Sequence, residues 1–168
     1  MIIREATEND IPAIVDIQIG GWLAAYRGMI SDEDLEKVAN SREERTARHT
    51  RKIHEYKYIV AEDEGGVVGF SRYVFDNSLS PDYDVDCELL ALYVKPDQKR
   101  RGIGKTLMSY VKDDFRRQDK KRMILWCLKD NMPSRGFYEA MGGTLVDREK
   151  EFDLNGHKYP EVGFLYEL

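Results

Sequence analysis

The chain has 168 residues, of which 42% are hydrophobic and 34% are charged, and its formal net charge at pH 7 is −5. This length and composition suit one compact domain over residues 1–168, and they exclude collagen-like, mucin-like and disordered chains. The longest apolar runs are far shorter than the ~20 residues of a membrane span, and the N-terminus lacks the basic and apolar regions of a secretory signal. We therefore expect a cytoplasmic protein with no membrane partner.

Basic residues are concentrated in one segment of the chain. Residues 95–122 contain eleven Lys and Arg but four Asp, a net charge of +7, which leaves −12 for the remainder. A basic stripe in an acidic protein indicates a site for a compact anion. Nucleic acid is the less favoured anion, because the acidic remainder would repel a long polyanion and the stripe lacks aromatic interleaving. We expect a small phosphate-bearing ligand and no nucleic-acid partner.

In chain order, the first predicted element is a short strand over residues 2–6. Thr7 stands three residues before Asp10, which is the spacing of a capping box, and the apolar residues that follow recur at helical spacing. An aromatic-rich turn of helix follows over 22–28. The next two predicted helices, each preceded by a serine with an acidic residue three places on, cover residues 32–39 and 42–55.

From residue 57 onward the apolar residues alternate as they do in strands. Strands over 57–62 and 67–75 flank Asp63-Glu64-Gly65-Gly66, a strong hairpin signal. The later predicted elements are a polar loop at 77–84, a strand at 85–94, a helix at 103–115, a strand at 123–128, a helix at 134–141, and strands at 144–152 and 158–168. The last two are joined by Asn155-Gly156, a pair typical of type I′ hairpins. This order predicts one mixed α/β sheet with helices on both faces.

The most informative segment runs from the strand at 85–94 through a short basic loop into a helix. Gly102 and Gly104 let the backbone pass close to a ligand, and free N–H groups at a helix N-terminus favour phosphate. A Walker A loop would need a glycine where Lys99 stands, and a Rossmann fingerprint would need one where Leu107 stands. The remaining alternative is a basic helix start with solvated side chains, which the helix dipole disfavours. The segment predicts a pyrophosphate site.

Two motifs resemble those of the GNAT N-acetyltransferase superfamily. Lys99-Arg100-Arg101-Gly102-Ile103-Gly104 resembles its acetyl-CoA motif, Q/R-x-x-G-x-G/A, with lysine at the first position. The segment from Asn131 to Gly142 resembles its second cofactor element, and residues 3–10 are similar to its opening strand and helix. The resemblance covers all 168 residues. It implies a mixed, mostly antiparallel sheet of about seven strands with helices on both faces, in which the strands at 85–94 and 122–128 splay apart.

The resemblance also implies that acetyl-CoA lies between the two splayed strands and is held by their backbone, by the basic loop and by the following helices. The residues expected to bind it are Leu92, Tyr93, Val94, Lys99, Arg100, Arg101, Gly102, Ile103, Gly104, Lys105, Asn131, Ser134 and Tyr138. The alternative for Asn131 is a helix N-cap, which does not conflict with a contact to the cofactor.

Acetyl transfer to an amine needs a group that removes the ammonium proton and a group that protonates the leaving thiolate. Tyr138 matches the second role through the motif, and half-buried packing is the alternative. Glu88 is an isolated acid before an apolar run, which suits a base with a raised pKa. On an ideal strand Glu88, Leu90 and Leu92 would share one face, and the alternative is an exposed charge at the start of the strand.

The two cysteines, Cys87 and Cys127, lack histidine neighbours in sequence, so we predict buried thiols and direct transfer rather than an acetyl-cysteine. The chain also lacks the ligand spacing of a metal site, so we predict no metal.

The acceptor site should come from segments outside the cofactor motifs. Trp22 and Tyr26 lie on one helix face and, with Arg27, resemble a pattern that roofs the acceptor pocket in small bacterial members. Glu161 and Glu88 add negative charge suited to an amine. We predict a small-molecule primary amine as acceptor and a possible homodimer. The alternatives are an enzyme acting on a peptide or protein amine, and a non-catalytic acyl-CoA-binding regulatory module.

Overall fold

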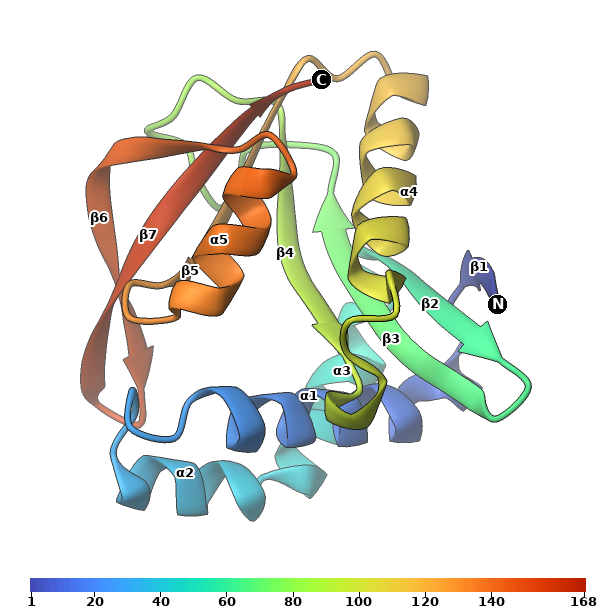
Figure 1. Cartoon of the computed structure of the whole chain (residues 1–168), viewed down its shortest axis with the longest axis vertical. Helices are drawn as coiled ribbons and strands as arrows, with labels where there is room; N and C mark the ends of the chain where they lie inside the picture. The colour runs from blue at the N-terminus through green and yellow to red at the C-terminus, as the bar shows by residue number, and fades with distance from the viewer.

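A computed structural model describes residues 1–168 as one seven-stranded sheet flanked by helices (Figure 1). The strands follow the spatial order β1-β2-β3-β4-β5-β7-β6. Their bounds are β1 (Ile2–Glu5), β2 (Lys57–Asp63), β3 (Gly66–Val74), β4 (Cys87–Val94), β5 (Arg122–Leu128), β6 (Thr144–Leu154) and β7 (His157–Glu167). All neighbouring strands pair antiparallel except β4 and β5, which are parallel. This topology confirms the predicted mixed, mostly antiparallel sheet.

The helices cover both faces of the sheet, as predicted. Their bounds are α1 (Ile11–Ala25), α2 (Asp32–Ala39), α3 (Arg42–Lys52), α4 (Ile103–Arg117) and α5 (Met132–Ala140). Figure 1 shows α1, α2 and α3 together at the bottom, and α4 and α5 in front of the sheet. Apolar residues of α4, such as Leu107 and Phe115, join one core cluster, whereas Ile14 and Ile17 of α1 join another. None of the helices combines the length and apolar character that crossing a membrane requires.

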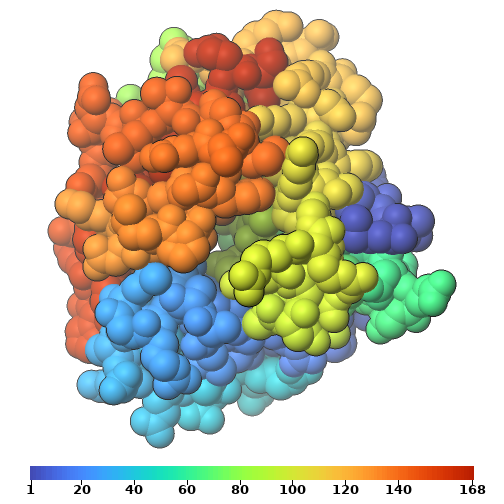
Figure 2. Space-filling model, in the orientation of Figure 1, coloured from blue at the N-terminus to red at the C-terminus, as the bar shows by residue number.

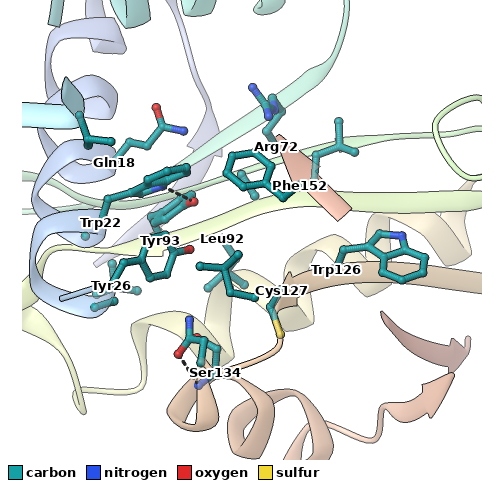
Figure 3. A pocket seen from close by; sticks show the side chains of 18 of the residues that line it. Gln18, Trp22, Tyr26, Arg72, Leu92, Tyr93, Trp126, Cys127, Ser134 and Phe152 are labelled. Atoms are coloured by element: carbon teal, nitrogen blue, oxygen red, sulfur yellow. Dashed lines mark hydrogen bonds between the residues drawn. The ribbon is translucent and has the colours of Figure 1, made fainter. Parts of the chain in front are cut away.

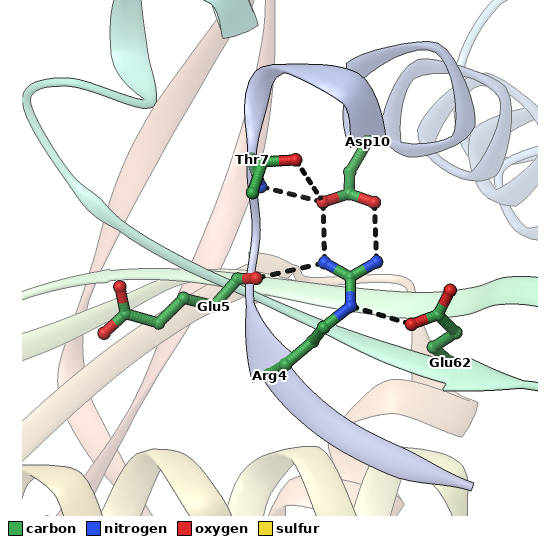
Figure 4. Close-up of polar contacts among 5 residues, drawn as sticks. All are labelled: Arg4, Glu5, Thr7, Asp10 and Glu62. Atoms are coloured by element: carbon green, nitrogen blue, oxygen red, sulfur yellow. Dashed lines mark hydrogen bonds and ion pairs between the residues drawn. The ribbon is translucent and has the colours of Figure 1, made fainter.

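A polar cluster fixes the start of the chain to the sheet (Figure 4). The Arg4 guanidinium donates two hydrogen bonds to the Asp10 carboxylate, at 2.8 and 2.9 Å, and a third to Glu62 on β2 at 2.7 Å. The Asp10 carboxylate in turn accepts from the Thr7 backbone N–H at 2.7 Å, which confirms the predicted capping box. Paired, bidentate guanidinium contacts are geometrically specific, so the cluster sets the angle at which α1 leaves β1.

Strands β4 and β5 pair over only three residues. Cys87, Glu88 and Leu89 lie opposite Met123, Ile124 and Leu125, and beyond these pairs the two strands diverge. The predicted splaying of the central strands is therefore confirmed. The divergence leaves the later part of β4 and the end of β5 without a partner on their facing edges.

A β-bulge at Leu90 changes which residues of β4 share a face. Tyr73 of β3 lies opposite Leu89, and the preceding residue, Arg72, lies opposite Ala91, so Leu90 is left without a partner. Leu89 and Leu92 consequently both face α4, whereas Ala91 packs with α1. The prediction that Glu88, Leu90 and Leu92 share a face is wrong, because an inserted residue shifts the alternation by one position.

Candidate active site

A large cavity of about 1770 Å³ lies where β4 and β5 diverge. Figure 2 shows the surface hollowed between α5, the loop before α4, and α1. Sites for single small molecules usually measure about 300–1,000 Å³. This cavity is therefore large enough for an extended cofactor together with a second, smaller molecule.

The basic loop forms one end of the cavity. Arg100 and Gly102 adopt left-handed backbone conformations, with φ of 63° and 81°, which turn the chain sharply into α4. Within α4, the Thr106 N–H donates to the Gly102 carbonyl at 3.0 Å. The N–H groups of residues 103–105 precede this first bond and have no partner within the helix. Together with the loop cations they suit a pyrophosphate.

Six of the seven loop residues predicted to bind the cofactor line the cavity. These are Lys99, Arg100, Gly102, Ile103, Gly104 and Lys105. Arg101 does not line it, because the sharp turn directs its side chain toward Asp63, with 4.0 Å between guanidinium and carboxylate. A Cβ placed on Gly104 would lie 3.5 Å from Phe137 and 3.7 Å from Leu92, which are ordinary contacts. The fold would therefore tolerate a Cβ there, in agreement with a motif that accepts glycine or alanine, but a branched side chain would occupy the space of a ligand lying against the backbone.

The unpaired edge of β4 supplies backbone groups to the middle of the cavity. The Lys95 N–H donates to Val68 on β3 at 2.8 Å. Because successive residues of a strand direct their N–H groups to opposite edges, the N–H groups of Leu92 and Val94 point to the edge that faces β5. The Tyr93 side chain instead turns toward α1, where its hydroxyl accepts a hydrogen bond from the Trp22 indole at 2.8 Å.

Helix α5 forms the wall across from this edge. Asn131 caps the helix, and its side-chain oxygen accepts from the Ser134 N–H at 3.3 Å. The N-cap alternative for Asn131 is therefore confirmed, and both residues also line the cavity. The Tyr138 side chain lines the cavity too, and its phenol makes no side-chain hydrogen bond within the protein. Burial raises the pKa of Tyr138 well above its usual value, so this phenol is a proton donor at neutral pH.

Cys127 lines the cavity near the end of β5. Burial, together with the nearby Glu161 carboxylate, raises the pKa of this thiol to about 12. Cys87 is buried as well, and burial again raises the pKa of its thiol. The predicted buried, free thiols are confirmed, and neither supplies a thiolate near neutral pH.

Glu88 lies behind the cavity wall rather than on it. Its side chain is buried, with a residue exposure of 3%, and the Ser80 hydroxyl donates to its carboxylate at 2.8 Å. Ser80 in turn accepts from the indole N–H of Trp126 at 3.1 Å, and Trp126 lines the cavity. Burial raises the pKa of Glu88. The alternative of an exposed charge at the start of the strand is wrong.

A second, small cavity of about 220 Å³ reaches Ser80 and Trp126 from the loop between β3 and β4. Ser80 is buried although it belongs to a loop that was predicted only to be polar. No local pattern marked it, because its position depends on the loop folding back over β4.

The remaining wall of the cavity combines aromatic and charged side chains (Figure 3). Trp22 packs edge-on against Tyr26 and Phe152, with ring centroids 4.9 and 5.7 Å apart. Glu161 also lines the cavity, and burial followed by repulsion from Glu88 raises its pKa. Arg27 is exposed and lies outside the cavity, because α1 ends at Ala25 and the chain turns away. The structure thus brings Trp22, Tyr26 and Glu161 together, but not Arg27.

Several cavity residues were not predicted from the sequence. Gln18, Arg45, Arg72 and Phe152 all line this wall. A usable signal existed for Arg72, which stands inside a mostly apolar strand, where burying a charge is costly unless the charge has a partner or a ligand. Arg45 sits in a highly charged helix, and its sequence surroundings do not distinguish it from its exposed neighbours.

Comparisons with known proteins agree with this geometry. A sequence model of the acetyltransferase (GNAT) family matches residues 23–143, more than half of the chain. YuaI of Bacillus subtilis, named an uncharacterized N-acetyltransferase, is 27% identical over 161 residues, covering 96% of this chain and 90% of its own. The peptidyl-lysine N-acetyltransferase YiaC of Escherichia coli is 26% identical over 146 residues, covering 87% and 85%.

Solved structures show the same fold. A GCN5-related N-acetyltransferase from Rhodopseudomonas palustris superposes with a TM-score of 0.82 at 18% identity, covering 99% of this chain and 95% of the other. The PaiA N-acetyltransferase of Thermoplasma acidophilum, in complex with coenzyme A, superposes with a TM-score of 0.72 at 20% identity, covering 96% of each chain. The chain belongs to the acetyltransferase (GNAT) family, which confirms the resemblance of its motifs and identifies it as an enzyme of this class.

Proposed function

We propose that this protein is a cytoplasmic, single-domain N-acetyltransferase that transfers the acetyl group of acetyl-CoA directly to a primary amine of a small molecule. One observation carries the proposal. A single cavity joins the phosphate-binding loop, the unpaired edge of β4 and a wall with aromatic and acidic side chains. Two molecules can therefore lie end to end and meet at the point where the strands diverge.

The residues around the cavity fit coenzyme A in both charge and shape. Lys99, Arg100 and Lys105 would surround its phosphates together with the free N–H groups at the start of α4. The backbone of Leu92 and Val94 would bind its extended arm, and the bare backbone at Gly104 allows the close approach that such a ligand needs. When bound, acetyl-CoA supplies an activated acetyl thioester.

Two side chains would handle the protons of the transfer. The free amine would attack the acetyl carbon, the carbon–sulfur bond would break, and the proton that the nitrogen loses as the amide forms would balance the proton that the sulfur gains. Tyr138 is suited to donate that proton, since its phenol is protonated and faces the cavity. Glu88 would take the ammonium proton through an intervening hydroxyl or water, because its carboxylate lies behind Ser80 and does not itself line the cavity.

A peptide amine is the competing acceptor, since one relative is named a peptidyl-lysine N-acetyltransferase. The acceptor end of the cavity favours the smaller molecule. The carboxylate of Asp34 on α2 is hydrogen-bonded to Tyr159 and His157 of β7, each at 2.6 Å. These hydrogen bonds hold α2 against the β6–β7 hairpin, and residues of both line the cavity. An extended peptide that entered between them would have to separate the two.

A thiol-release assay with acetyl-CoA and a broad panel of small amines and lysine peptides tests the proposal. Small amines should release coenzyme A faster than peptides of similar charge. Faster release with peptides would replace the acceptor assignment. Binding of acetyl-CoA without release with any amine would indicate the non-catalytic module. The predicted homodimer is a separate question, which the oligomeric state in solution answers.

A further inference from the structure

Two arginines of the acceptor wall have no acidic partner. Arg45 has a residue exposure of 4%, and its Nε donates to the Ser41 hydroxyl at 2.7 Å. Arg72 donates to the Tyr58 hydroxyl at 3.3 Å, while its Nε is buried without any hydrogen-bond partner. Neither guanidinium forms a salt bridge, although both line the cavity. Buried charges are normally paired, because desolvation of an unpaired charge is costly.

The surroundings of these arginines supply aromatic faces but no counter-ion. The Arg45 guanidinium lies 4.7 Å from the centre of the Trp22 ring, and that of Arg72 lies 5.7 Å from the Tyr56 ring. Such contacts stabilise a cation by less than a paired carboxylate with hydrogen bonds does. Between the two arginines lies a neutral chain in which His49 is hydrogen-bonded to Gln18 and to Tyr58, each at 2.9 Å. Burial, followed by repulsion from the nearby arginines, lowers the pKa of His49 to about 4, so this ring is uncharged at neutral pH. Glu44, which precedes Arg45 on α3, is already paired with Arg48.

The other arm of the opening carries the opposite charge. Glu161 lies on β7 opposite Leu128 of β5, whereas Arg72 lies on β3 opposite Ala91 of β4. Both side chains line the same cavity. Figure 3 places Arg72 beside Phe152, across the cavity from Ser134 and therefore away from the cofactor wall. The acceptor end thus has a positive side and a negative side.

We propose that the acceptor is a small amino acid-like molecule, with a carboxylate bound by Arg72 and Arg45 and an amine held toward Glu161. This inference rests on the proposed function, since it describes the second substrate of the same site. It adds that the acceptor is zwitterionic, which excludes polyamines and simple amines as preferred substrates. The carboxylate would supply the counter-charge that neither guanidinium finds within the protein.

Matched pairs of acceptors test the proposal. The twenty common amino acids and their carboxamides would be compared by thiol release at saturating acetyl-CoA. At least one amino acid should have a kcat/KM about 100-fold or more above that of its amide, because a site built for a hydrogen-bonded group strongly rejects the analogue that lacks it. Arg72→Met should lower kcat/KM for the acid to near that of the amide, mainly through KM. Arg42→Met, on the exposed side of α3, is the matched control and should leave the preference intact.

The outcomes separate this inference from the proposed function. Equal use of acids and amides, with coenzyme A released, would overturn the carboxylate site and leave the acetyltransferase intact. If no amine releases coenzyme A, the carboxylate site is tested by the effect of amino acids on the melting temperature of the protein. An amino acid that stabilises the wild-type protein in the presence of coenzyme A, but not Arg72→Met, would still support the site. No shift with any amino acid would overturn it. Retained acetyl-CoA binding by Arg72→Met shows that this variant is folded.

Discussion

Gly104→Val should abolish cofactor binding while the protein still folds. The added Cβ would lie 3.5 Å from its nearest neighbour, Phe137, which is an ordinary contact. Valine is also no poorer a helix former than glycine, and residue 104 lies in the first turn of α4. The motif accepts alanine at this position, but the two further methyl groups of valine would extend into the cavity, where the backbone would lie against pyrophosphate. Gly20→Val in α1 is the matched control, since its Cβ would lie 3.8 Å from Pro96 and Gly20 does not line the cavity.

The expected size of the effect follows from mass action. Acetyl-CoA at 100 times its Kd should stabilise the wild-type protein by about 2.7 kcal/mol, a rise in Tm of roughly 5–11 °C for a chain of this length. A 100-fold loss of affinity leaves about 0.4 kcal/mol, or roughly 1–2 °C. Differential scanning fluorimetry with and without acetyl-CoA measures both. A full ligand shift in Gly104→Val would refute the close backbone approach. Loss of the shift in Gly20→Val as well would show that the effect is not specific to residue 104.

Three further changes test the proton donor, the base and the acceptor end. Tyr138→Phe should lower turnover by ~10²-fold or more in a thiol-release assay while acetyl-CoA affinity stays within a few-fold. Glu88→Gln should lower the rate by ~10²-fold near pH 7, and a pH–rate profile should show the deficit shrinking as the acceptor amine deprotonates. Burial alone would raise the pKa of Asp34, but hydrogen bonds from Tyr159, His157 and Ser31 lower it to about 2. Asp34→Asn should therefore reduce the free energy of unfolding by about 1–3 kcal/mol at neutral pH, measured by urea denaturation.

A specific result would contradict each of these three predictions. Unchanged turnover in Tyr138→Phe would leave the phenol a packing role and make solvent the proton donor. A Glu88→Gln deficit that is constant across pH would indicate that the carboxylate positions substrate by charge. The carboxylate of Asp34 has a lowered pKa in the folded state, so its contribution is present above the unfolded value of about 3.8 and is lost as pH falls toward 2. Equal acid sensitivity in the wild-type protein and in Asp34→Asn would contradict that contribution.

The sequence predicted the elements whose cause is local. Asn155 and Gly156 both have positive φ, 53° and 86°, as the type I′ turn requires, and the turn fixes the β6–β7 hairpin. The observed ends of some helices and strands differ from the predicted ends by a few residues, at positions where a capping side chain or a pairing strand determines them. Helix α5 begins at Met132 rather than at residue 134, because Asn131 supplies the cap. Likewise β4 begins at Cys87 rather than at residue 85, where its pairing with β5 begins.

The site was less predictable because side-chain directions depend on distant contacts. The run from Leu89 to Leu92 is wholly apolar, so it contains no alternation from which a bulge could be detected. The motif correctly indicated a loop near the cavity, but the left-handed conformation of Arg100 decides that Arg101 points elsewhere. The unpaired charge of Arg72 becomes apparent only when its neighbours from two other segments are in place.

The three-residue pairing of β4 with β5 divides the sheet into two arms that share one short hinge. Backbone hydrogen bonds near such a seam open at a lower free energy than those in the middle of each arm, so their amide hydrogens exchange faster with solvent. The cavity therefore lies at the seam where two neighbouring strands share the fewest paired residues. A molecule that contacts both arms should hold them together, and its binding should slow amide exchange along this seam.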